Sequence, residues 1–175
     1  RSRVTVLITG ESGTGKELVA SAIESLGNPE RKAPYIRLNC AAVPDTLVES
    51  ELFGHEPGAF TGARTQKPGL LLRAHRGTVF LDEIADMSLS AQAKIERFLQ
   101  EREFLPLGGQ KTVHVDVRVI AASNRDLPAL AKSGAFRPEL LWRLDVVNLR
   151  VPPLRERRED VPLLVDQILR RLDKD

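Results

Sequence analysis

The sequence predicts an α/β fold in which a parallel sheet of five strands lies between helices. Three observations lead to this prediction. Short apolar runs alternate with helical patterns along most of the chain. The runs are nearly continuous in apolar residues, which is typical of strands that are buried on both faces. A glycine-rich turn follows the first run and opens a helix, a context that is typical of phosphate-binding loops.

Each apolar run is expected to form one strand, and the segments between the runs have the periodicity of helices. The predicted strands are residues 4–8, 35–38, 79–81, 117–121 and 146–151. One helix is expected to end near Gly27, and another has a single apolar face made by Ala91, Ile95, Phe98 and Leu99. The other predicted helices are Asp45–Phe53, Leu127–Lys132, Pro138–Leu144 and Val161–Leu172.

Two segments interrupt this alternation. Residues 54–69 carry four glycines and two prolines, and residues 104–114 include Gly108 and Gly109. Both segments are expected to project from the sheet or from its helices. Ligands of parallel sheets collect at the carboxyl ends of the strands, so that edge of the sheet is the expected site.

Composition excludes several classes of protein. A formal net charge of +2 is too small to argue for nucleic-acid binding, and the charged run at 155–160 is interpreted as a solvated helix start. No apolar run approaches the ~20 residues of a membrane span, and there is no signal-peptide pattern. Cys40 is the only cysteine, which excludes an internal disulfide and fits a reducing cytoplasm, the expected location. The histidines and Cys40 lack the spacing of zinc ligands.

The glycine-rich turn predicts a nucleoside triphosphate site. Its glycines allow backbone N–H groups to point at phosphate oxygens, and Lys16 adds positive charge near the terminal phosphates. Glu17 stands where the general pattern has the Ser or Thr that ligates magnesium. The alternative is a glycine-rich turn with a surface lysine. The turn consists of Gly10, Glu11, Ser12, Gly13, Thr14, Gly15, Lys16 and Glu17.

Two carboxylates, Asp82 and Glu83, follow the buried run at 79–81 and predict the second half of this site. Asp82 is expected to hold Mg²⁺, directly or through water. Glu83 is expected to orient the water that attacks the terminal phosphate. The alternative is a strand that ends in a solvated acidic turn.

Polar residues later in the chain leave two interpretations open. Ser123 and Asn124 follow another buried run and could touch the terminal phosphate, or Asn124 could cap the next turn. Arg137 and Arg143 are expected near one end of a helix. They form surface salt bridges or deliver charge to the nucleotide of a neighbouring subunit.

A loop of small residues surrounds the single aromatic Phe60. Leaving that side chain in water costs about 1.5–3 kcal/mol, so it packs on its own domain or contacts a partner. Local sequence alone favours packing on its own domain. The loop consists of Gly58, Ala59, Phe60, Thr61, Gly62 and Ala63.

Together these motifs resemble the AAA+ domain of bacterial sigma-54-dependent transcriptional activators, the enhancer-binding proteins. The resemblance covers essentially the whole chain and is carried, in order, by GESGTGKE, GHEPGAFTGA, GTVFLDEI, VRVIAASN, FRPELLWRLDVV and PPLRER. It implies a P-loop NTPase AAA+ core at residues 1–153 and the start of an incomplete helical lid at 154–175. A glutamate at position 17 is usual in this family.

The resemblance also implies roles for individual residues. Residues 10–17 would be the Walker A loop, and Asp82 and Glu83 the Walker B pair. Asn39 would be the switch asparagine that interacts with Glu83. The other implied roles are sensor I for Asn124, trans-acting arginine fingers for Arg137 and Arg143, sigma-54 contact for Phe60 and Thr61, and the second pore loop for residues 107–111.

The implied activity is hydrolysis of ATP with Mg²⁺ between the subunits of a ring, expected to be a hexamer. Loss of the terminal phosphate would move the loop at residues 58–63, which pushes on the sigma-54 RNA polymerase holoenzyme and opens promoter DNA. DNA would be contacted through a helix-turn-helix domain outside this chain. The alternatives are another AAA+ remodelling ATPase and a non-catalytic module that binds ATP only to fix its shape.

Overall fold

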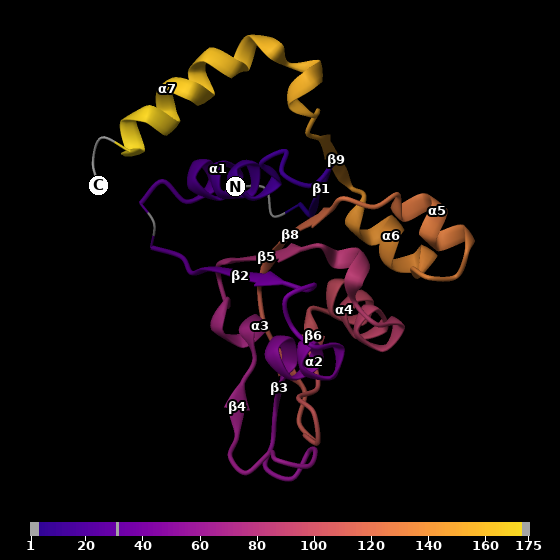
Figure 1. Cartoon of the computed structure of the whole chain (residues 1–175). Coiled ribbons are helices and arrows are strands. Elements are labelled where there is room, and N and C mark those ends of the chain that lie inside the picture. Colours follow the sequence, from indigo (N-terminus) through magenta and orange to yellow (C-terminus); the bar gives the residue numbers. More distant parts are fainter. Residues whose placement is uncertain (1–3, 31, 173–175) are drawn as a thin grey trace.

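A computed structural model describes residues 4–30 and 32–172, so the outermost residues of both predicted domains lie outside the described range. The predicted fold class is confirmed, because five parallel strands form one sheet in the order β2-β5-β8-β1-β9 (Figure 1). The strands are β1 (Val6–Thr9), β2 (Tyr35–Asn39), β5 (Thr78–Asp82), β8 (Arg118–Ser123) and β9 (Val147–Arg150).

The central strands are buried on both faces, as their continuous apolar runs predict. Alternate residues point to opposite faces, so two cores form from the same strands. The larger core contains Leu7, Leu81 and Val119, and the smaller core contains Ile8, Phe80 and Ile120.

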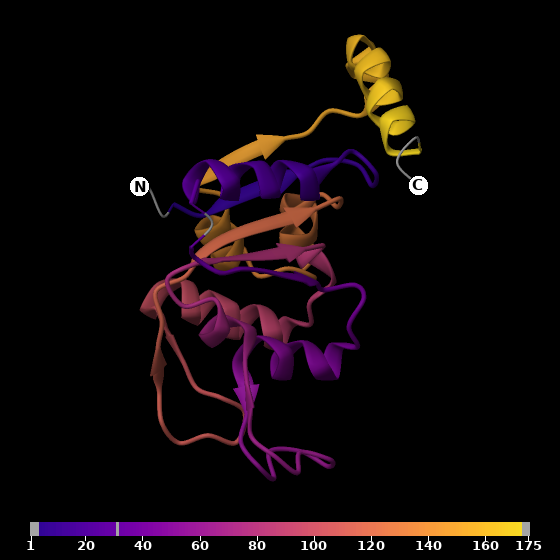
Figure 2. The same ribbon diagram turned by 90° about the vertical axis from the view of Figure 1, so that its left-hand side faces the viewer.

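Helix α1 (Lys16–Gly27) covers the smaller core, and the helices between β2 and β9 cover the opposite face (Figure 2). That second layer is dominated by α4 (Leu89–Glu101), whose Ala91, Ile95 and Phe98 are fully buried. Ser88 caps α4 by accepting a hydrogen bond from the backbone N–H of Ala91. The other helices of the layer are α2 (Asp45–Phe53), α3 (Leu70–Arg73), α5 (Leu127–Lys132) and α6 (Pro138–Leu144).

Both predicted projections are hairpins, and they extend from the same end of the molecule beside α2 and α4 (Figures 1 and 2). The first is formed by β3 (Gly54–His55) and β4 (Lys67–Pro68), and the second by β6 (Glu103–Phe104) and β7 (Val113–His114). The short α3 was missed, because a run of three leucines has no helical periodicity.

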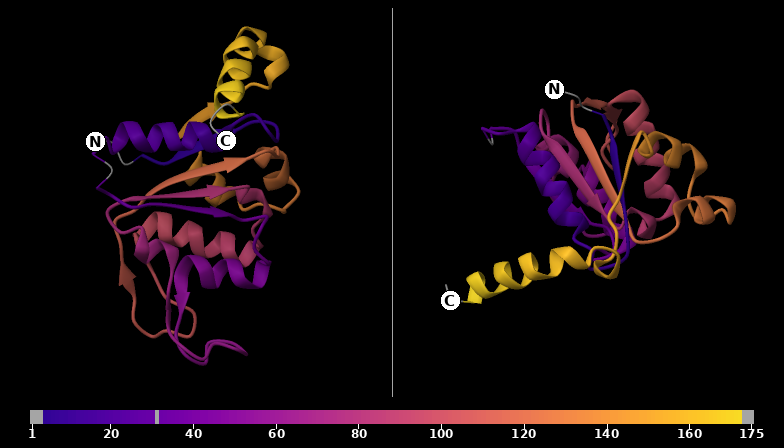
Figure 3. Two further views of the ribbon diagram at one scale, coloured as in Figure 1. Left: turned by 60° about the vertical axis from the view of Figure 1, so that its left-hand side comes forward. Right: turned by 90° about the horizontal axis from the view of Figure 1, so that it is seen from above.

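The chain leaves the sheet through two short 3₁₀ turns, η2 (Leu154–Glu156) and η3 (Arg158–Asp160), and continues as α7 (Val161–Leu172). Figure 3 shows α7 standing away from the sheet on the side of α1. Most of its apolar residues are exposed, among them Leu163, Ile168 and Leu172. Within residues 4–30 and 32–172, no helix is long and apolar enough to span a membrane.

Candidate functional site

The glycine-rich turn lies at the carboxyl end of β1 and leads directly into α1. Gly13 and Gly15 have φ angles of 78° and 92°, a left-handed conformation that an L side chain disfavours. Gly10 is needed for a different reason, because a Cβ at this position would come within 2.5 Å of the carbonyl oxygen of Val151. The turn thus depends on glycine at three positions, two for conformation and one for space.

Lys16 points into this turn rather than into solvent, and it is only 6% exposed. Its ammonium group donates to the carbonyl oxygens of Gly10 at 3.0 Å and Glu11 at 3.2 Å. The same nitrogen lies 3.4 Å from Oε1 of Glu83. The alternative of a surface lysine is therefore wrong: Lys16 is a buried cation inside a loop whose backbone can bind an anion.

Asp82 and Glu83 follow β5 at the same edge of the sheet as the phosphate loop. Glu83 has φ 50° and ψ 51°, a left-handed conformation that costs of order 1 kcal/mol for a residue with a side chain. This conformation directs its carboxylate between Lys16 and β8, where Oε2 accepts the backbone N–H of Asn124 at 3.0 Å. The site thus joins β1, β5 and β8 through one carboxylate.

The pKa of Asp82 is raised, first by burial and then by the negative charge of Glu83. A nearby cation would relieve both effects, so the position fits a metal ligand. The residues from 4 to 172 that the structure describes contain no cluster of three or more metal-ligating side chains. One carboxylate with phosphate and water oxygens is nevertheless a common environment for Mg²⁺.

Glu17, which occupies the usual magnesium-ligand position, forms an ion pair with Arg37 of β2. Both side chains are more than half exposed. Glu17 lies in the first turn of α1, where its charge also complements the helix dipole.

Asn39 ends β2 and Asn124 directly follows β8, so both lie at the same edge of the sheet as the phosphate loop. The Oδ1 atom of Asn39 accepts the backbone N–H groups of Ala41 and Ala42, at 3.0 and 3.2 Å. It therefore shapes the turn after β2, while Glu83 is held by Lys16 and by the backbone of Asn124. Asn39 lies opposite Asp82 in the sheet, on strand β2, which is the direct neighbour of β5.

The turn after β8 is organised by Ser123 rather than by Asn124. The Ser123 hydroxyl is fully buried and accepts the backbone N–H of Arg125 at 3.0 Å. Asp126 then caps α5 by accepting the N–H of Ala129 at 2.9 Å. Of the two interpretations of Asn124, the one in which its side chain caps this turn is not supported, because Ser123 and Asp126 supply the caps. Its side chain is exposed at the site edge.

Arg137 and Arg143 do not share one end of a helix, because α6 is only seven residues long. Arg137 is its N-terminal cap, and Arg143 lies in its last turn. Both side chains nevertheless bind the same face of α4: Arg137 Nε lies 2.8 Å from Oε2 of Glu96, and Arg143 Nη2 lies 2.8 Å from Oε1 of Gln100. Residues four apart on a helix share a face, so α4 aligns the two arginines.

Gln92 of α4 fixes the start of α6 and therefore the position of Arg137. Its side chain is completely buried, donates to the Met87 carbonyl at 2.8 Å and accepts the Arg137 N–H at 2.9 Å.

Gln92→Leu leaves both backbone groups without this partner, so we expect the free energy of unfolding to fall by about 2 kcal/mol. Urea denaturation measures the change. Gln167→Leu on the exposed face of α7 is the control, and equal losses in both variants would contradict the assignment.

Cys40 does not have the properties of a nucleophile. Its side chain is buried, and this desolvation raises the pKa of the thiol to about 12. The thiolate is therefore scarce at neutral pH.

The small-residue loop forms the tip of the first hairpin. Phe60 is 38% exposed, and its ring packs edge-on against His55 with centroids 5.0 Å apart. His55 is in turn joined to Ser50 of α2 through Nδ1 and Oγ, at 2.8 Å. Phe60 thus packs partly on its own domain, as local sequence favours, yet keeps an exposed apolar face.

The two hairpins are joined by their backbones. The N–H of Glu56 donates to the Leu107 carbonyl at 2.9 Å, and the N–H of Leu107 donates to the Gly54 carbonyl at 3.0 Å. Gly108 is positioned so that a Cβ would lie 2.9 Å from that of Ala59. Leu107 and Gly108, the first residues of the segment 107–111, therefore lie against the first hairpin, and the two hairpins should move together.

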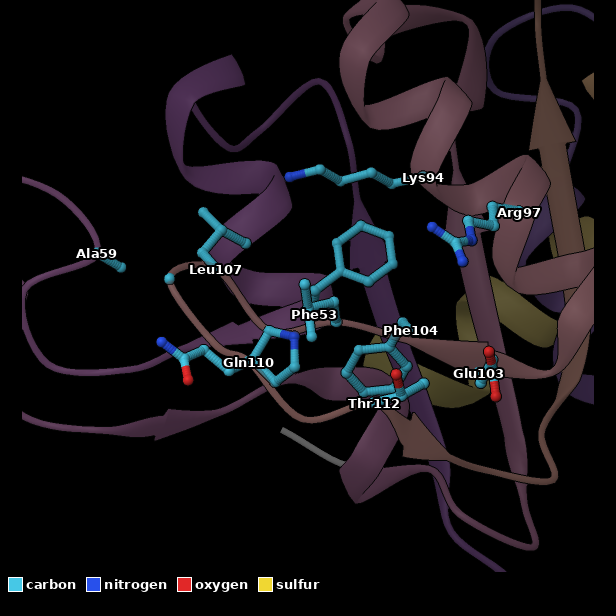
Figure 4. Close-up of a pocket in the computed structure, with 12 residues that line it drawn as sticks. Phe53, Ala59, Lys94, Arg97, Glu103, Phe104, Leu107, Gln110 and Thr112 are labelled. Atoms are coloured by element: carbon cyan, nitrogen blue, oxygen red, sulfur yellow. The ribbon is translucent and has the colours of Figure 1, made fainter.

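A cavity of about 550 Å³ lies under this junction (Figure 4). Phe53, Phe104 and Leu107 form its apolar wall, while Lys94 and Arg97 of α4 line one side. None of the residues that line this cavity belongs to the phosphate loop. The cavity is therefore a feature of the two hairpins and of the helix α4 beneath them.

Comparison with known proteins matches this architecture to one family. The family described as the sigma-54 interaction domain matches residues 1–150. The chain belongs to the sigma-54 interaction domain family. It is 55% identical over 174 residues to the regulatory protein AtoC of Escherichia coli (strain K12), and this match covers 99% of the chain and 38% of AtoC. It is 54% identical over 168 residues to a Nif-specific regulatory protein of Herbaspirillum seropedicae, covering 96% and 31%.

Solved structures agree with this sigma-54 interaction domain in fold. NtrX from Brucella abortus in complex with ATP superposes with a TM-score of 0.87 at 40% identity, covering 98% of this chain and 38% of NtrX. The NtrX complex with ADP gives a TM-score of 0.88 at 40% identity, covering 97% and 36%. The resemblance inferred from the motifs is thus confirmed, and the chain spans less than two fifths of the length of these relatives.

One pair of residues in this sigma-54 interaction domain was missed from sequence. Arg155 and Arg157, in the charged run interpreted as a solvated helix start, contact the phosphate loop. Arg155 binds the Glu11 carboxylate through both guanidinium nitrogens, with one bond of 2.8 Å. Arg157 donates to the Thr14 carbonyl at 2.7 Å. Both arginines belong to the PPLRER segment that carries part of the family resemblance, but the residues of that segment do not show which groups the arginines contact.

Proposed function

We propose that this domain hydrolyses ATP in a ring of identical subunits and uses the energy to remodel sigma-54 RNA polymerase. The observation that carries the proposal is the position of Glu83. Its carboxylate lies 3.4 Å from the ammonium of Lys16 and accepts the backbone N–H of Asn124, so the candidate base and the phosphate-binding cation are in direct contact. The ATP complex of NtrX, a relative with the same fold, supports ATP as the ligand.

In this proposal the phosphate loop binds the triphosphate, with Lys16 on its terminal phosphates. Asp82 would hold Mg²⁺, directly or through water, and the ion would neutralise charge on the phosphates. Glu83 accepts a proton from the attacking water. Asn39 and Asn124, on either side of the carboxylates, sense whether the terminal phosphate is present.

The other proposed roles concern contacts with the adjacent subunit, with sigma-54 and with DNA. Arg137 and Arg143 serve the nucleotide of the adjacent subunit, in a ring that we expect to be hexameric. The loop Gly58–Ala63 touches sigma-54 through Phe60 and Thr61, and DNA is bound by a different domain of the full-length protein. Residues 1–153 then form the AAA+ core, and residues 154–175 begin its lid.

The Thr61→Ala variant of the full-length protein tests the link between hydrolysis and remodelling. Thr61 is exposed at the hairpin tip and distant in sequence from the phosphate site, so ATP turnover should stay within about twofold of wild type. Promoter opening by sigma-54 RNA polymerase should fall by at least about tenfold, as expected for a lost contact at an interface centre. Thr65→Ala, an exposed threonine of the same hairpin, is the matched control. Normal promoter opening by Thr61→Ala would favour another AAA+ remodelling ATPase.

A further inference from the structure

The segment that follows β9 wraps over the phosphate loop before α7 begins. The N–H of Val151 donates to the Thr9 carbonyl at 2.7 Å, and the Val151 carbonyl occupies the space where Gly10 would carry a Cβ. The next residues turn through η2 and η3. The segment therefore begins in contact with the first residue of the loop and ends at α7.

The first side-chain contact joins Arg155 to Glu11. Two parallel bonds between a guanidinium and a carboxylate fix the relative orientation of both groups. The backbone carbonyl of Glu11 accepts the hydroxyl of Thr14 at 2.8 Å and the ammonium of Lys16 at 3.2 Å. Holding the Glu11 side chain thus also holds the carbonyl around which the loop is organised.

The second contact bears on the phosphate-binding amides themselves. Arg157, 27% exposed, donates to the Thr14 carbonyl at 2.7 Å and lies 3.6 Å from the carboxylate of Asp160. A trans peptide is planar, so its carbonyl and its following N–H point in opposite directions. Binding the Thr14 carbonyl from outside therefore turns the N–H of Gly15 away from Arg157 and toward the interior of the loop.

We infer that Arg155 and Arg157 are positioning residues that hold the phosphate loop in its nucleotide-binding shape and connect it to α7. The inference rests on the proposed ATPase function, which gives the loop its ligand. The connection is short, because only η3 separates Arg157 from the start of α7. A change in the loop on nucleotide binding or release is therefore transmitted to α7 through these two arginines.

Two measurements on the full-length protein test this inference. In the absence of nucleotide, Arg157→Ala should raise hydrogen exchange of the amides at 13–16 about tenfold, since a hydrogen bond from a charged group is lost. In steady-state hydrolysis it should raise the KM for ATP about tenfold and leave kcat within about threefold, because the loss affects binding rather than the chemical step. Arg157→Lys retains a donor and should restore part of both effects.

Charge reversal separates the ion pair from other effects of mutation. Arg155→Glu should raise exchange in the loop, and the double variant Glu11→Arg with Arg155→Glu should reverse most of that rise. Arg158→Ala is the control, because Arg158 is an exposed arginine of the same segment and none of its described contacts joins its side chain to the loop. Unchanged exchange and KM in Arg155→Glu and Arg157→Ala would overturn the inference. A wild-type protein that neither binds nor hydrolyses ATP would overturn the proposed function, and the exchange measurement would still decide whether the arginines hold the loop.

Discussion

Glu83→Gln is expected to lower ATP turnover of the full-length protein by about 10²–10⁴-fold, the usual contribution of a general base. The amide keeps the size of the carboxylate and an oxygen that can accept the Asn124 N–H. It cannot take a proton from water. It also removes the negative charge 3.4 Å from Lys16, so the affinity for ATP should be unchanged or slightly higher.

Turnover and ATP binding must therefore be measured separately, the first by phosphate release and the second by titration with a fluorescent ATP analogue. Lys16→Ala gives the complementary result, since it should abolish binding. Glu30→Gln, at an exposed glutamate paired with Lys32, controls for loss of one surface charge. Equal turnover in wild type and Glu83→Gln would show that the domain binds ATP without hydrolysing it at this site.

Arg143→Ala and Arg137→Ala are each expected to reduce turnover by about 10³–10⁵-fold, the range known for arginines that stabilise charge in phosphoryl transfer. The fold should survive, because the contacts to Glu96 and Gln100 are surface interactions worth about 0–1 kcal/mol. Arg97→Ala is a matched control, since Arg97 pairs with Glu101 on the surface of α4. Activity and secondary structure of each variant are compared with wild type.

Mixing of inactive subunits decides whether the arginines act on a neighbour. An Arg143→Ala subunit has an intact Lys16, and a Lys16→Ala subunit has an intact Arg143. In an equal mixture about one quarter of the interfaces combine both intact groups, so turnover should recover to roughly that fraction of wild type. If the mixture remains as inactive as either variant alone, Arg143 acts within its own subunit or only in folding.

The sequence was most informative where the structure is local. The strands and most helices were predicted to within about two residues, because burial on two faces and an apolar helical stripe leave their period in the sequence. The phosphate loop was also predictable, since its glycines and lysine are consecutive and follow a strand. Side-chain contacts were not predictable in this way: Asn39 binds the turn that follows it, and Arg137 and Arg143 lie at opposite ends of α6 rather than near one end.

By itself, the sequence determined the fold class, the glycine-rich turn before α1, the carboxylates after β5 and the family, because each depends on residues that are adjacent or periodic along the chain. Only the tertiary structure decided which of these groups meet. Glu83 reaches the backbone of Asn124 because β5 and β8 are neighbours in a sheet whose order differs from chain order. Arg155 reaches Glu11 across 144 residues because the chain returns beside β1 after forming β9. Such pairings depend on how strands are ordered and which way each side chain turns, and neither leaves a periodic signal in the sequence.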